Sequence, residues 1–156
     1  MFFKKKIKIR DFCYKKYDFI FTEAGKRIMD DLIDRSGISL DEGSKENYYS
    51  NFIAAYFQLA GVAFSRTLSR DLRYEVLRIN SEYLREKEAS HIDDLFSIYN
   101  SAFGSSFQDG IRPMAQVIAK EITSEKANNV ENIFYDAFYG ILEAFFTDLK
   151  GIKLIL

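Results

Sequence analysis

The chain has 156 residues, of which 47% are hydrophobic and 29% charged, and its formal net charge is −1. This balance is typical of a folded protein of one domain and excludes a disordered chain. No apolar run is long enough for a membrane-spanning helix, and the single cysteine, Cys13, excludes an internal disulfide. We therefore expect one soluble, cytoplasmic domain over residues 1–156.

The first half of the chain shows helical spacing of its apolar residues. A first helix is expected over 9–21, and a second begins after Thr22 as its cap and ends at Gly37, which suits a left-handed position. A third helix, near 45–67, is apolar on almost every side from Phe52 to Phe64. That pattern predicts a central helix surrounded by the others.

The second half continues the same spacing. Four more helices are predicted: near 70–88, from Ser90 to a stop at Asp109-Gly110 with Phe107 last in its inward stripe, from Pro113 to about Ile122, and from Asn128 or Asn129 to Gly151. The last of these has the widest apolar stripe in the chain. Residues 1–8 are expected to be a basic, frayed end, and residues 152–156 an apolar tail. The predicted fold is all-α, a compact bundle or orthogonal array of six to seven helices.

Catalytic chemistry is poorly supplied by this sequence. His91 is the only histidine, and with Glu88 it has the spacing of half of a di-iron carboxylate site, for which the chain offers no second pair. Cys13 lies on the apolar stripe of the first helix, where burial makes a thiol inert. No glycine-rich phosphate loop occurs. We expect no metal and no cofactor, and the balance is against an enzyme.

Arg85 and His91 provide one alternative. Their Arg-x5-His spacing resembles the Arg-x(4–6)-His signature of the HEPN ribonucleases, which are all-helical. The resemblance implies that Arg85 and His91 form a catalytic pair across a dimer interface and cleave RNA. It covers these two residues only, and Glu86 stands where the family commonly has Asn, His or Asp.

Nucleic-acid binding is a second alternative. Residues 1–27 carry nine Lys/Arg against three Asp/Glu. The cluster that could contact phosphates consists of Lys4, Lys5, Lys6, Lys8 and Arg10, followed by Lys15 and Lys16. Residues 31–39 also resemble the middle of a helix-turn-helix, with Gly37 in the turn, although the following helix opens with acidic residues.

Protein binding is the function that the sequence favours. The chain contains 15 Phe and 10 Tyr, and we expect many half-buried tyrosines of the kind found on recognition surfaces. Two charged surfaces are candidates: the acidic set Asp93, Asp94, Asp109, Glu121 and Glu131, and the basic row Arg66, Arg70 and Arg73. An inhibitor or immunity-type protein that covers a basic partner is the specific hypothesis. Pairing of the apolar tail in a homodimer is a further possibility.

Overall fold

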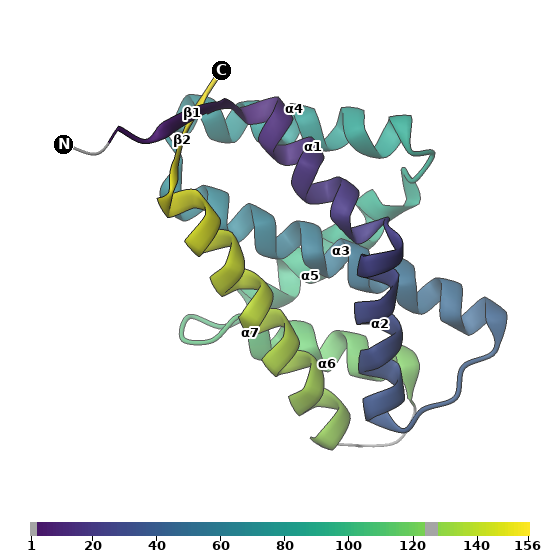
Figure 1. The fold of residues 1–156 in the computed structure, drawn as a ribbon. Helices are drawn as coiled ribbons and strands as arrows, with labels where there is room; N and C mark the ends of the chain where they lie inside the picture. The colour runs from purple at the N-terminus through teal and green to yellow at the C-terminus, as the bar shows by residue number, and fades with distance from the viewer. Residues whose placement is uncertain (1–2, 124–127) are drawn as a thin grey trace.

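A computed structural model of the chain describes residues 3–123 and 128–156 (Figure 1). These residues form seven helices and two short strands: β1 Lys5–Lys8, α1 Ile9–Ile20, α2 Glu23–Ser36, α3 Glu42–Thr67, α4 Arg70–Glu86, α5 His91–Gly104, α6 Ile111–Ile122, α7 Asn128–Lys150 and β2 Ile152–Ile155. The predicted all-α array is confirmed. In the part of the chain that the structure describes, no helix is long and apolar enough to cross a membrane.

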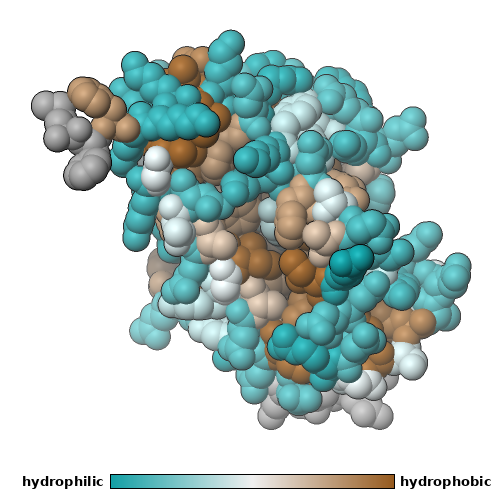
Figure 2. All heavy atoms as spheres, viewed as in Figure 1, coloured by the Kyte–Doolittle hydropathy of each residue, from teal (hydrophilic) through white to brown (hydrophobic). Residues whose placement is uncertain are grey.

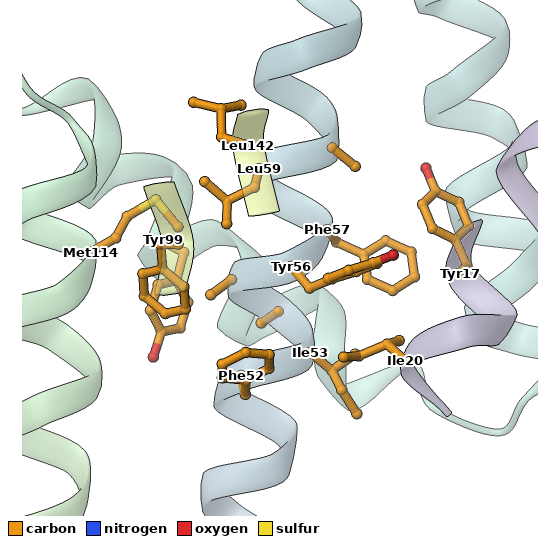
Figure 3. Packing of buried hydrophobic residues seen from close by; sticks show 14 of the residues in the cluster. Tyr17, Ile20, Phe52, Ile53, Tyr56, Phe57, Leu59, Tyr99, Met114 and Leu142 are labelled. Atoms are coloured by element: carbon orange, nitrogen blue, oxygen red, sulfur yellow. The ribbon is translucent and has the colours of Figure 1, made fainter. Parts of the chain in front are cut away.

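Helix α3 is the centre of the fold, as its apolar composition predicts. It packs against α1, α5, α6 and α7. From Phe52 to Phe64 every residue except Gly61 is buried. In Figure 3, Tyr17 lies on one side of α3, and Tyr99 and Met114 lie on the other. Helices α1, α5, α6 and α7 therefore surround α3.

Three helix boundaries differ from those expected, and one of them is the start of α6, which begins at Ile111, two residues before Pro113. Helix α3 begins at Glu42 because Asp41 caps it, with the Asp41 carboxylate accepting a hydrogen bond from the Ser44 N–H at 2.7 Å. Helix α5 ends at Gly104, so that Phe107 lies beyond it and is fully exposed, which corrects the predicted inward stripe. Beyond Phe107 the chain returns so close to Phe103 that a side chain at Gly110 would lie 2.6 Å from that residue.

The tyrosines are more deeply buried than the sequence suggests. Five are buried, and each donates its hydroxyl hydrogen to an acceptor within the chain: Tyr17 to Asn80, Tyr48 to the Met29 carbonyl, Tyr56 to the Lys16 carbonyl, Tyr83 to Asp18 and Tyr99 to Asn51. Such partners remove the cost of burying a hydroxyl. Half of the tyrosines therefore belong to the core, and only Tyr14, Tyr49 and Tyr135 are half-buried, which is fewer than the sequence suggests.

The two ends of the chain pair with each other. Strand β1 runs parallel to β2, with Lys5 opposite Ile152 and Lys8 opposite Ile155. Leu154 is buried, which gives the pair one apolar face against the helices. Residues 5–8 and 152–155 thus form a small sheet, where the sequence predicts a frayed end and a tail. Because β1 leads into α1 and β2 follows α7, this sheet holds the start of α1 next to the end of α7.

Candidate partner-binding groove

A groove lies between α7 on one side and α1 and α2 on the other. From the β1–β2 pair, α1 and α7 diverge, and α3 crosses behind them (Figure 1). The groove between these walls has a volume of about 800 Å³. Figure 2 shows apolar atoms along this hollow and polar atoms on both sides of it. The volume lies within the range of natural binding sites.

The lining of the groove is largely apolar. Apolar residues of α1, α2, α3 and α7 line the groove, among them Phe19, Ile28, Leu32, Tyr56, Ala137, Ile141 and Phe145. Phe19 is 40% exposed and Ile28 is 42% exposed. Large apolar side chains that gather in a hollow, instead of lying singly on the surface, are typical of binding sites.

The middle of the α7 wall is low, because the side chains there are small. Asp136, Gly140, Ala144 and Asp148 follow one another at four-residue spacing and line the groove as one row. The two small residues lie between the two aspartates. A Cβ atom added at Gly140 would meet nothing within 4 Å. The wall therefore leaves free space that a partner can enter.

Charged residues form the two rims of the groove. Lys16 of α1 forms an ion pair with Asp148 of α7 and joins the two walls at one end. On α2, Arg35 pairs with Asp31 at 3.5 Å. Among the described residues, Lys15 and Arg27 on the α1–α2 rim and Asp136 on the α7 rim make no ion pair. The rims thus present two free cations opposite one free carboxylate.

The acidic residues predicted as a partner surface do not share one element. Asp93 and Asp94 are exposed in the first turn of α5, where the helix dipole favours them. The other three have partners within the chain. Glu121 accepts a hydrogen bond from Asn47 at 3.3 Å, Glu131 pairs with Arg112 at 3.3 Å, and a hydrogen bond with Asp109 raises the pKa of Tyr135.

The predicted basic row is exposed at the junction of α3 and α4. Arg70 and Arg73 line a shallow hollow of about 230 Å³ together with Tyr74 and Leu77. The Arg70 guanidinium lies 5.5 Å from the centre of the Tyr74 ring. Arg66 lies beside Phe103, 6.0 Å from the ring centre. This surface lies mainly on one helix, and its hollow is far smaller than the groove.

The basic N-terminal cluster is divided by the fold. Lys4, Lys5, Lys6 and Lys8 are exposed on or next to β1. Arg10 instead donates hydrogen bonds to Glu82 of α4 at 2.6 Å and to Tyr14 of α1 at 2.9 Å. The first of these bonds connects α1 to α4. The helix after Gly37, which the helix-turn-helix resemblance assigns to DNA reading, is the central α3. Helix α3 is covered by other helices from Phe52 to Phe64, and its exposed first turns carry Glu42 and Glu46, whose negative charges oppose contact with phosphates.

The two residues of the ribonuclease alternative lie on different helices. Arg85 is near the end of α4, and His91 begins α5. The His91 Nε2 lies 3.2 Å from the Ser50 hydroxyl of α3. In the described residues, no carboxylate is hydrogen-bonded to His91, and no hydrogen bond or ion pair joins it to Arg85. Three or more potential metal ligands do not gather anywhere in that part of the chain.

Cys13 is buried in the core, as predicted, and this burial can be tested chemically. Burial raises the pKa of the Cys13 thiol to about 12. At pH 8 its thiolate fraction is then roughly a thousandfold below that of a free cysteine. We expect an aromatic disulfide reagent to leave the native chain unlabelled over the time in which it fully labels the chain in urea. Rapid labelling of the native chain would contradict the packing of α1.

Three comparisons with known proteins find no matching family model, no similar curated protein and no similar solved structure. The groove offers apolar contact and charged rims. Its ionisable residues are lysines, arginines, aspartates and one tyrosine, Tyr56, whose hydroxyl is bonded to a backbone carbonyl.

The groove was missed from the sequence. Ile28 lies on the apolar stripe of α2, and Gly140 and Ala144 lie within the long helix α7, so the spacing of apolar residues does not distinguish these positions from core positions. The one available signal is the width of the α7 stripe from Val130 to Leu149. A stripe that is wider than a single packing contact needs indicates that the helix makes a second apolar contact.

Proposed function

We propose that this chain is a non-catalytic binding protein and that a partner protein occupies the groove between α1–α2 and α7. The observation that carries the proposal is a hollow of about 800 Å³ whose lining includes half-exposed Phe19 and Ile28. Covering apolar surface is favourable by about 25 cal/mol per Å², and the charged rims supply specificity. The groove is also more than three times as large as the hollow beside Arg70 and Arg73.

A glycine substitution tests this proposal without damage to the core. Gly140→Leu places a side chain in the groove, where nothing lies within 4 Å of the new Cβ. We expect a tagged Gly140→Leu chain to capture at least about tenfold less of its protein partner from a lysate of the source organism, because blocking a hot-spot pocket typically costs about 2 kcal/mol or more. The measurement is quantitative mass spectrometry of the captured proteins, eluted stepwise with salt.

The matched control is Gly104→Leu. Gly104 is an exposed helical glycine at the end of α5, outside the groove, and a Cβ there also meets nothing within 4 Å. This variant should capture the partner as well as the original chain does. Equal capture by both variants, or equal loss in both, would overturn the groove as the partner site.

The same experiment separates the other functions. Nucleic acid that is captured by every variant and released at moderate salt would instead support phosphate binding by Lys5, Lys6 and Lys8, which are exposed on β1. The inhibitor-type role has less support, because only Asp93 and Asp94 of its five acidic residues are free of partners within the described chain. A partner whose capture is insensitive to Gly140→Leu would favour that surface.

A further inference from the structure

We propose that the occupant of the groove is an amphipathic α-helix of the partner, with acidic residues along one flank and a basic residue along the other. This inference rests on the proposed function and specifies the structure and charge of the bound segment. Three features of the groove lead to it: its cross-section, the low middle of the α7 wall and the charges of its two rims.

The size of the groove matches one face of a helix. Asp136 and Asp148 mark its extent along α7, and the twelve helical steps between these two residues span about 18 Å. A volume of about 800 Å³ over that length gives a cross-section of about 45 Å². A whole helix of 10–12 Å diameter has a cross-section of roughly 80–110 Å². The groove therefore accepts about half of a helix, which is its apolar face.

The α7 wall allows a helix to approach closely. Gly140 and Ala144 place no bulky side chain between the two aspartates of their row. Helices pack by setting the ridge of one into the groove of the other, with axes 8–10 Å apart. A ridge of large apolar side chains at helical spacing on the partner would lie over this low region. It would cover Phe19, Ile28 and Ile141, which line the same hollow.

The rims determine the flanks of the partner helix. Lys15 and Arg27 on the α1–α2 rim make no ion pair among the described residues, and they favour carboxylates on the adjacent flank. Asp136 on the α7 rim favours a lysine or arginine on the opposite flank. A helix can carry acidic residues along one side of its apolar stripe and basic residues along the other, so that each kind of charge faces one rim of the groove. A fatty acid has one charged end, and it therefore matches only one rim.

The test is a selection of displayed peptides of about 16 residues, long enough to span the groove as a helix. The library is selected on the original chain and counter-selected on Gly140→Leu. We expect the enriched peptides to have apolar residues at i, i+3, i+4 and i+7, with Asp or Glu on one flank. The best synthetic peptide should gain helical circular dichroism on binding, and its affinity is measured by fluorescence anisotropy.

A charge exchange then tests the orientation. Arg27→Glu should weaken the selected peptide about fivefold, the effect of an exposed ion pair, and the loss should shrink at high salt. Changing the facing acidic residue of the peptide to lysine should restore the affinity. Arg85→Glu, on α4 and outside the lining of the groove, is the matched control and should change nothing.

The failures of the two proposals are distinguishable. Suppose that Gly140→Leu prevents capture of the lysate partner. If the selected peptides are then proline-rich or show alternating apolar residues, or if no displayed peptide binds, the helical occupant is wrong. The groove remains the partner site in that case. Helical peptides that are indifferent to Arg27→Glu would overturn the assigned flanks. If no protein and no peptide distinguishes Gly140→Leu from the original chain, the proposed function fails as well.

Discussion

Truncating Phe52 to alanine is expected to lower the free energy of unfolding by about 3–5 kcal/mol. The Phe52 ring is fully buried in α3. It lies 5.7 Å from the ring of Phe138, 6.4 Å from that of Phe134 and 6.2 Å from that of Tyr48. Because those rings come from two helices, they cannot collapse into the space left by the lost ring, and a cavity remains.

A loss of this size is a large part of the total stability of a domain, which is about 5–15 kcal/mol. Urea unfolding followed by circular dichroism measures it as a lower midpoint. The control is Phe107→Ala, because Phe107 is fully exposed and its removal leaves no cavity. If the two variants were equally stable, Phe52 would not lie in the core and α3 would not be the central helix.

Gly25→Ala is expected to cost about 2–3 kcal/mol, in spite of the higher helix propensity of alanine. Gly25 is buried in the first turn of α2, where α2 lies against the end of α1. A Cβ there would lie 2.5 Å from the Phe19 carbonyl oxygen and 2.7 Å from that of Ile20. Both contacts are to backbone, so no side chain can rotate away and α2 must shift.

The comparison variant is Gly140→Ala, with the same chemical change in another helix. Gly140 faces open space, and the gain in helix propensity should raise stability by about 0.5–1 kcal/mol. The two substitutions are thus expected to have opposite signs in the same urea experiment. Destabilisation by both would show that a partner element fills the space at Gly140, which would remove the groove.

The local structure of this protein was predictable from the sequence. The three-to-four-residue spacing of apolar side chains located the helices, because the helical period is fixed by backbone geometry. Gly37 was predicted to be left-handed and has a φ of 70°. The uninterrupted apolar character of Phe52–Phe64 indicated the central helix, and the position of Cys13 on an apolar stripe indicated its burial. Each of these features depends on neighbours within a few residues.

The tertiary structure decided what covers each apolar face. The pairing of β1 with β2 joins the two ends of the chain, and neither strand has enough residues to show a pattern alone. The buried tyrosines required hydroxyl acceptors such as Asn51 and Asp18, and these became neighbours only after folding. The sequence alone could therefore not distinguish core tyrosines from surface ones.

The groove is also a feature that only the tertiary structure decided. Its walls come from residues 15–35 and 136–148, and its depth depends on how far α1 and α7 diverge from the β1–β2 pair. The sequence determined that Ile28 and Ile141 lie on apolar helix faces. It could not determine that the packing of seven helices leaves part of those faces open, because periodicity indicates that a face is apolar and not which element covers it.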